Sequence, residues 1–459
     1  MGTRDGLVAE SGRARAAAWR WTPATRPVAC HFSEGPAMSG RPANAETSAA
    51  AGRTGMAVCR ICRSAETEIV LDLGMQPISS HFAATPGAPA PRHPLELGVC
   101  RTCGSVQLAQ PFPAADLVPP FDWITYREPE DHLDEVVSWI RALPGLPANA
   151  RIAGLGFKDI TTVDRLRALG FTQAWILDAA TELGAASAGV ESVQALLTPE
   201  RAAAIRDWRG PVDLLIARHV LEHAEDPGRF LTALGALLAP GGYLMLEVPE
   251  CGSNLARQDY AMIWEEHAQY FTPQTLPQVL ALAGCAPVDQ NVYPYPFEDV
   301  IVALGRKTAA SAAAQTPAAS AVSHVVQLAR AFGSAFPEHT ARYRRLLEGW
   351  TKDGRKLAAY GAGHLSCAFI NFHGLADTFA FVIDDSPQKQ GLFLPGCDLP
   401  IVARTRLVAT DISIALFGLG PQTEEKIIAA NPEFIRGGGR FHSMLVDSPR
   451  SICEHVLRL

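Results

Sequence analysis

The 459-residue chain is long enough for two or three domains, and its charge gives no sign of nucleic-acid binding. Its 40 basic and 47 acidic residues give a formal net charge of -7, and 48% of its residues are hydrophobic, which suffices for packed cores. No apolar run approaches the roughly 18 residues of a membrane helix, and the N-terminus lacks the apolar core of a secretory signal. We therefore expect a cytoplasmic protein with neither a membrane nor a nucleic-acid partner.

The first stretch, residues 1–55, is rich in Ala, Arg, Gly and Ser and has little apolar periodicity. Such a composition buries too little apolar surface to offset the entropy of ordering, so we predict a disordered extension. Met56 directly precedes the first ordered-looking motif, which leaves both Met1 and Met56 as candidate start residues.

Two CxxC pairs follow, Cys59/Cys62 and Cys100/Cys103. Four thiolates at this spacing can occupy the corners of a tetrahedron around a structural Zn²⁺, with no position left open for catalysis. Gly104 suits the backbone turn behind the second pair. We predict a zinc-binding domain over residues 56–115. The alternatives are a redox site or two unrelated thiol pairs.

An aromatic and charged loop, residues 121–132, leads into a helical pattern that begins at Leu133. It is a candidate cover for a pocket, and the alternative is a segment that packs between domains.

An α/β domain is predicted over residues 116–305. Its first strand turns into a helix through Gly154 and Gly156, and its second strand ends at Asp178. Glycines at such a turn let a nucleotide-like ligand approach the backbone, and an acid after the second strand can accept hydrogen bonds from ribose. The apolar run from Val212, a helical pattern and a second apolar run to Glu250 complete a βαβ unit.

Polar residues end the strand that begins at Val212, namely Arg218 and His219, where open α/β sheets place their ligands. Further on, Glu265, Glu266 and His267 stand in a row. A carboxylate beside an imidazole can form a general acid/base cluster, and the alternative is a solvated helix start.

An Ala/Ser/Thr-rich segment, residues 306–322, is typical of a linker. Beyond it, residues 323–459 predict a second Rossmann-like domain. Its first strand runs into a glycine loop, and its second strand is followed by acids and a lysine. The polar and glycine residues of this second edge are Tyr360, Gly361, Gly363, Asp384 and Lys389.

These motifs, in this order, resemble a known family: the three-domain S-adenosylmethionine (SAM) dependent C-methyltransferases of nucleotide-linked deoxysugars. The resemblance covers roughly residues 57–450. It is carried by CRIC with CRTCG, ARHVLEHAEDP with LLAPGGYLMLEVP, EEHAQYFT, AYGAGHLSCAFIN and VIDDSPQKQGLFLPGCDLPI. It implies a zinc-binding domain, a central class I methyltransferase domain and a C-terminal Rossmann-like domain.

The resemblance also implies roles for individual residues. A base removes a proton α to a keto group, and the resulting enolate attacks the methyl group of SAM. The positions implied for catalysis are His267, Glu266, His223 and Tyr126. Those implied for SAM are Gly154, Gly156, Asp159, Asp178, Arg218 and His219. The C-terminal edge would hold the nucleotide end of a small-molecule substrate.

The chain departs from the family pattern where tyrosines are usual. Trp264 replaces the tyrosine of a Tyr-His-Glu-His motif, and Phe121 and Trp123 stand in the aromatic loop, which leaves Tyr126 as its only phenol. Because these changes remove hydroxyls from the substrate pocket, we infer a substrate other than the usual deoxysugar carbon. Three hypotheses follow: C-methylation, O- or N-methylation by the same architecture, and a non-catalytic binding protein.

Overall fold

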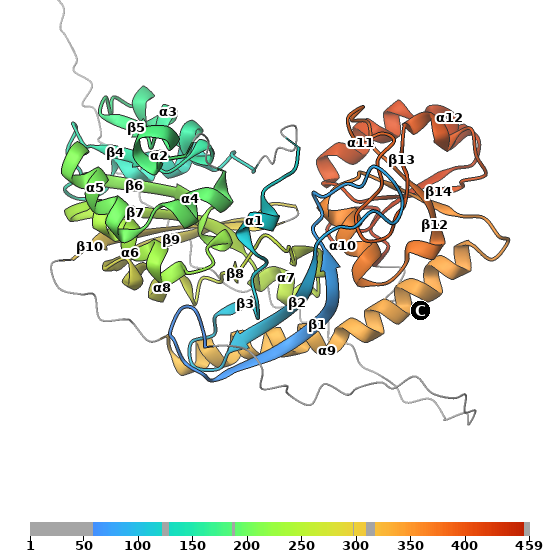
Figure 1. Cartoon of the computed structure of the whole chain (residues 1–459), viewed down its shortest axis with the longest axis horizontal. Coiled ribbons are helices and arrows are strands. Elements are labelled where there is room, and N and C mark those ends of the chain that lie inside the picture. Colours follow the sequence, from blue (N-terminus) through green and yellow to red (C-terminus); the bar gives the residue numbers. More distant parts are fainter. Residues whose placement is uncertain (1–57, 122–127, 186–188, 297, 309–316, 454–459) are drawn as a thin grey trace, which may run out of the picture. The chain divides into compact units, whose positions relative to one another are not determined.

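A computed structural model of the chain describes residues 58–121, 128–185, 189–296, 298–308 and 317–453. The predicted N-terminal extension, residues 1–55, lies outside these ranges. Within them the strands form three sheets, one of four strands, one of six and one of five (Figure 1). In the same residues, no helix is long and apolar enough to cross a membrane.

The first sheet has the strand order β1-β2-β3-β8. Strands β1 (Thr67–Pro77) and β2 (Arg92–Cys100) pair antiparallel, and β3 (Val106–Leu108) continues the sheet. The fourth strand, β8 (Gln269–Tyr270), comes from the predicted methyltransferase domain and pairs with β3. The predicted boundary at residues 115 and 116 therefore does not separate the sheets, because a later segment completes the N-terminal one.

The central sheet has the order β5-β4-β6-β7-β10-β9. Its first four strands are parallel, whereas β10 and β9 run antiparallel to their neighbours. The strands are β4 (Ile152–Gly154), β5 (Ala174–Ile176), β6 (Val212–Arg218), β7 (Leu238–Glu250), β9 (Cys285–Tyr293) and β10 (Asp299–Lys307). Because β4 has β5 on one side and β6 on the other, the strand order reverses beside it, and such a reversal opens a ligand crevice.

Helices connect these strands. They are α1 (Ala114–Leu117), α2 (Leu133–Arg141), η1 (Phe157–Asp159), α3 (Ile160–Ala168), η2 (Ala179–Leu183), α4 (Val190–Leu196), α5 (Pro199–Arg209), η3 (Leu221–His223), α6 (Pro227–Leu237), α7 (Gly252–Arg257), η4 (Tyr260–Met262) and α8 (Leu276–Leu282). The predicted βαβ unit is confirmed as β6, α6 and β7. Helix α6 starts where the Asp226 side chain accepts a hydrogen bond from Arg229 N, and its Phe230, Leu231 and Leu234 are buried.

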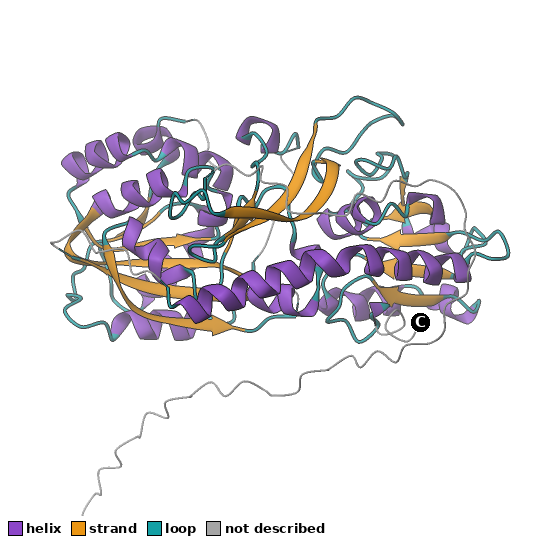
Figure 2. Ribbon diagram, turned by 90° about the horizontal axis from the view of Figure 1, so that it is seen from below, coloured by secondary structure: helices purple, strands orange, loops and turns teal. Residues whose placement is uncertain are grey.

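A single long helix, α9 (Ala319–Trp350), follows the central sheet and continues through Pro337 (Figure 2). It packs on β1, where a Cβ at Gly333 would come 1.8 Å from the carbonyl oxygen of Val70, so only glycine allows this approach. The predicted linker, residues 306–322, is too long at both ends. Strand β10 extends to Lys307 and α9 begins at Ala319, because alanine is a strong helix former as well as a common linker residue.

The C-terminal sheet is parallel throughout, with the order β13-β12-β11-β14-β15. This confirms the second Rossmann-like α/β domain. Its strands are β11 (Leu357–Tyr360), β12 (Phe379–Ile383), β13 (Ile401–Val402), β14 (Ile414–Phe417) and β15 (Arg440–Ser443). Its helices are α10 (His364–Phe372), η5 (Ala376–Thr378), η6 (Arg404–Leu407), α11 (Pro421–Ala430) and α12 (Pro432–Arg436).

Candidate functional site

The four cysteines of the CxxC pairs lie together. Their sulfur atoms are within 4.8 Å of one another, with Cys59 and Cys103 Sγ 3.7 Å apart and Cys62 and Cys100 Sγ 3.5 Å apart. Tetrahedral Zn²⁺ with bonds of about 2.3 Å separates its sulfurs by about 3.8 Å, so the cluster fits this ion.

Each cysteine pair is held in a tight turn. The amide N–H of Arg63 donates to Cys59 O, and that of Gly104 donates to Cys100 O. Arg63 and Gly104 both have positive φ, 62° and 76°, so both turns close through a left-handed residue. The sequence predicted the glycine but not the matching arginine.

A recess lies at the carboxyl end of β4, where the sequence predicted the cofactor. It is lined by Leu155, Gly156, Phe157, Lys158, Asp159, Gly189, Val193, Arg218 and Val220. At Gly156 an added Cβ would meet only Val193 Cγ2, at 3.8 Å, which leaves the backbone open to a ligand. At Gly154 it would lie 2.7 Å from Ile176 Cδ1, so this glycine serves close packing of the strands.

The carboxylate of Asp159 holds this loop in place. It accepts hydrogen bonds from the amide N–H groups of Leu155 (2.7 Å), Gly156 (3.0 Å) and Arg218 (2.9 Å). Burial raises the pKa of Asp159 to about 7, although these donors and the Arg218 guanidinium oppose the shift. The geometry therefore gives Asp159 a structural task in shaping the recess.

Asp178 lies two residues after β5, at the same edge of the sheet, and is exposed. Its Oδ1 accepts hydrogen bonds from the amide and the hydroxyl of Thr181, which lower its pKa. The side chain is an ionised acceptor on the rim, as a ribose-binding position requires.

Glu247, which the sequence reading missed, is the centre of a buried charge network. It lies in β7 opposite Arg218 of β6 and is fully buried. Its carboxylate is 2.7 Å from Arg218 Nε, 3.0 Å from His219 Nε2 and 3.3 Å from His132 Nε2. Burial acts to raise the pKa of Glu247, but the Arg218 charge and hydrogen bonds from His132 and His219 hold it well below its usual range. A lone acid in an apolar strand was the one available signal.

His219 is held in an unusual backbone conformation, with φ 47°. Its ring lies between Glu247 and Glu222, and Oε1 of Glu222 is 3.4 Å from Nδ1 of His219. Burial acts to lower the pKa of His219, but Glu128, Glu222 and Glu247 raise it to about 10. Arg218 and His219 are thus buried cations paired within the protein. The structure gives neither a free polar group aimed at the recess.

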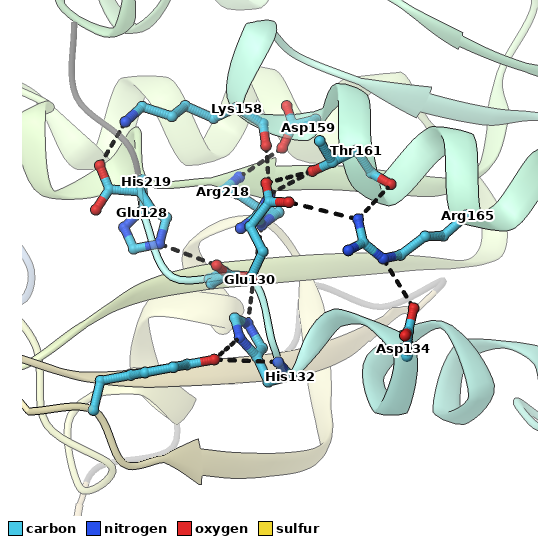
Figure 3. Close-up of polar contacts among 12 residues, drawn as sticks. Glu128, Glu130, His132, Asp134, Lys158, Asp159, Thr161, Arg165, Arg218 and His219 are labelled. Carbon is cyan, nitrogen blue, oxygen red and sulfur yellow. Dashed lines mark hydrogen bonds and ion pairs between the residues drawn. The ribbon is translucent and has the colours of Figure 1, made fainter. Parts of the chain in front are cut away.

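The last residues of the aromatic loop, 128–132, lie against this network (Figure 3). Glu128 pairs with Lys158, and Glu130 accepts a hydrogen bond from the Thr161 hydroxyl at 2.6 Å and lies 3.6 Å from Arg218. Residues 128–132 therefore cover residues of the predicted cofactor edge. Tyr126 and Trp123 lie outside the described residues.

His223 and His267 come together, as the family resemblance implied. Their rings meet edge to face with centroids 5.0 Å apart, and Glu222 lies beside both. Burial and Lys158 lower the pKa of His223 to about 3, and burial and His223 lower that of His267 to about 3. Both imidazoles are therefore neutral at neutral pH and able to accept a proton.

The solvated helix start considered for residues 265–267 is wrong. Glu265, Glu266 and His267 are 4%, 2% and 6% exposed, in a turn that leads into β8. A second recess borders this turn and takes side chains from the zinc-binding domain. It is lined by Pro111, Phe112, Ala114, Leu117, Gln194, His223, Glu225, Glu265, Glu266 and Ala268.

The predicted C-terminal edge also forms a cluster. Lys389 Nζ lies 3.2 Å from Asp384 and donates to Ala362 O, while the Tyr360 hydroxyl donates to Asp385. Gly361 has φ 103°, and a Cβ there would come 3.0 Å from Gly418 O, whereas Gly363 has open space around it. These polar groups are paired with one another beside an open glycine loop.

A doubly wound sheet with a glycine turn after its first strand and an acid after its second is a nucleotide-binding arrangement, which class I methyltransferases share. The comparisons agree. Family models match residues 59–117 as a zinc binding domain, residues 150–290 as a methyltransferase domain and residues 306–445 as a C-methyltransferase C-terminal domain. The chain combines these three domains in order, and the matches identify it as a SAM-dependent methyltransferase.

One relative covers most of the chain. The C-methyltransferase NovU of Streptomyces niveus is 26% identical over 400 residues, which are 83% of this chain and 94% of NovU.

Two solved structures are similar over part of the chain. The 1,6-didemethyltoxoflavin-N1-methyltransferase of Burkholderia thailandensis, with bound S-adenosylhomocysteine, is 19% identical over 39% of this chain and 79% of its own (TM-score 0.28). The magnesium protoporphyrin IX methyltransferase of Synechocystis is 14% identical over 38% and 82% (TM-score 0.25).

Proposed function

We propose that the protein transfers the methyl group of SAM to a carbon α to a keto group of a small, nucleotide-linked sugar or related natural product. The observation that carries the proposal is the pair of neutral imidazoles, His223 and His267, beside Glu222 and Glu266. A neutral imidazole is the form of histidine that accepts a proton, and the charges of Glu222 and Glu128 oppose the effect of burial on the pKa of His267.

In this proposal SAM lies in the recess after β4. The proposed contacts to SAM are the open backbone of Gly156 and the carboxylate of Asp178 at the rim. The proposed residues that shape this edge of the sheet are Gly154, Asp159, Arg218 and His219. SAM supplies an electrophilic methyl group when bound. Residues 128–132 lie over this edge and help to exclude water from it.

His267 is the proposed base that removes the α-proton, and Glu266 and His223 support it. Tyr126 stays a candidate for the same pocket.

The open loop at Gly363 is proposed to hold the nucleotide end of the substrate. The residues around this loop are Tyr360, Gly361, Asp384 and Lys389. Cys59, Cys62, Cys100 and Cys103 are the proposed ligands of a structural zinc. We propose a cytoplasmic location, because a reducing compartment keeps the four clustered cysteines as thiols able to bind a metal.

O- or N-methylation by the same residues is the second candidate, because a neutral His267 could equally deprotonate a hydroxyl or an amine. Calorimetry with SAM tests the shared requirement of both. Zinc-loaded protein should bind SAM with one site per chain. If it binds no SAM, the chain is a non-catalytic relative, and both transfer reactions are excluded.

A further inference from the structure

We propose that Glu265 is a positioning residue, which fixes the segment bearing Glu266 and His267 through a buried polar contact with His364 of the C-terminal domain. This inference rests on the proposed role of His267. It goes beyond that role because it gives a function to Glu265, a buried carboxylate that the proposed reaction does not use. It also gives a function to His364, which begins helix α10 of the C-terminal domain.

Both oxygens of Glu265 are engaged. Oε1 accepts a hydrogen bond from the amide N–H of Ser79 at 2.6 Å, and Oε2 lies 3.5 Å from His364 Nδ1. The side chains of Glu265 and His364 are only 4% and 8% exposed, so solvent screens this pair little. Burial acts to raise the pKa of Glu265, but His364 and the Ser79 amide lower it. The carboxylate is therefore ionised.

His364 makes two further contacts with the same stretch of chain. Its ring stacks on Trp264, with centroids 4.6 Å apart and planes at 24°, and its Nε2 lies 3.3 Å from Ala261 O. Trp264 in turn lies 5.2 Å from the ring of His267, and its carbonyl accepts a hydrogen bond from the amide of His267. A short chain of contacts thus joins His364 to the proposed base.

The same contacts join the two ends of the proposed substrate site. His364 directly follows Gly363, whose loop is the proposed hold for the nucleotide end of the substrate. Glu265 directly precedes Glu266 and His267. The polar contact therefore sets the distance between the loop that binds one end of the substrate and the base that acts on the other. A misplacement of about 1 Å in such a constellation can cost about 10²-fold in rate.

Three full-length variants isolate the polar contact. Glu265→Gln keeps an oxygen for the Ser79 amide and removes the charge. His364→Phe keeps the stack on Trp264 and removes both ring nitrogens. The exchange Glu265→His with His364→Glu restores a carboxylate and an imidazole in reversed order. Asp447→Asn is the matched control, because its partner Arg257 (2.9 Å) forms an ion pair that touches neither segment.

The readouts are kcat and KM with a nucleoside diphosphate-linked keto sugar, SAM affinity, and backbone hydrogen exchange over residues 264–270. Each single variant should lower kcat by about tenfold or more. SAM affinity should stay within about twofold, exchange of the segment should rise, and the exchanged pair should recover part of kcat. Asp447→Asn should change none of these.

An unchanged kcat and unchanged exchange in Glu265→Gln would overturn the proposal. So would an equal loss in Asp447→Asn, because the pair would then serve domain assembly in general. The exchange measurement needs no substrate. If the native protein does not methylate the keto sugar but Glu265→Gln alone raises exchange over residues 264–270, the positioning role stands and the proposed function fails.

Discussion

The imidazole of His223 meets that of His267 edge to face, with ring centroids 5.0 Å apart and planes at 88°. Two imidazolium ions at this distance would repel each other, so the contact disfavours protonation of both rings at once. The two residues come from η3 after β6 and from the turn before β8, so the central sheet and the N-terminal sheet together build the pair.

The neutral pair predicts the outcome of replacing the base. His267→Gln should lower turnover by about 10²–10⁴-fold, because a positioned general base contributes about that much. SAM affinity should not change, since the recess after β4 does not include His267. The control is His93→Gln, which alters an imidazole paired with Asp116 in the zinc-binding domain and should keep full turnover. Full turnover in His267→Gln would remove His267 from the reaction.

The same pair predicts how stability depends on pH. The pKa of His267 is about 3 when folded and about 6.5 when unfolded. Between these two pH values the unfolded chain binds a proton at His267 that the folded chain does not bind. The stability that the neutral imidazole contributes to the fold is therefore present above about pH 6.5 and is lost as the pH falls toward 3. Urea denaturation from pH 7 to pH 4.5 should show a shallower loss of stability in His267→Gln than in the native protein. Parallel curves would contradict the neutral imidazole.

Two neighbouring glycines separate packing from ligand approach. Gly154→Ala places a Cβ 2.7 Å from Ile176 Cδ1 and should destabilise the fold, by about 1–3 kcal/mol as overpacking commonly does. Gly156→Ala meets only Val193, at 3.8 Å, and should melt like the native protein. It should nevertheless weaken SAM binding, because its methyl group enters the recess. Unchanged SAM affinity in Gly156→Ala would place the cofactor elsewhere.

Zinc should be required for folding. Metal analysis of the native protein should give one zinc per chain, and Cys62→Ser should lose both the metal and cooperative unfolding, because the ligands are tied to the first sheet. Cys397→Ser is the matched control, a free cysteine outside the cluster that should keep the zinc. A well-folded native protein without zinc would refute the assignment.

The elements with a clear apolar period were predictable from the sequence. Strand β6, helix α6 and strand β7 fall where the apolar runs placed them, and β11 and β12 precede the predicted loops. The two CxxC pairs were equally clear, because their spacing alone brings four sulfurs together.

Other features could not be seen because they arise from contacts between distant segments. The two residues of β8 have no period, yet they complete the N-terminal sheet. In the sequence Glu247 is a lone acid in an apolar strand. Only the folded chain places Arg218, His219 and His132 around it. For the acidic row at 265 and 266 the sequence left open an acid/base cluster and a solvated helix start, since only the folded chain shows Ser79 and His364 against Glu265.

The position of the transferred methyl group tests the central claim most directly. Zinc-loaded protein should be incubated with SAM carrying a ¹³C-labelled methyl group and a nucleoside diphosphate-linked keto sugar, and the product examined by NMR. C-methylation predicts a labelled methyl group bonded to the carbon α to the keto group, and no such product with His267→Gln. A label on oxygen or nitrogen, or no transfer by protein that binds both ligands, would contradict it.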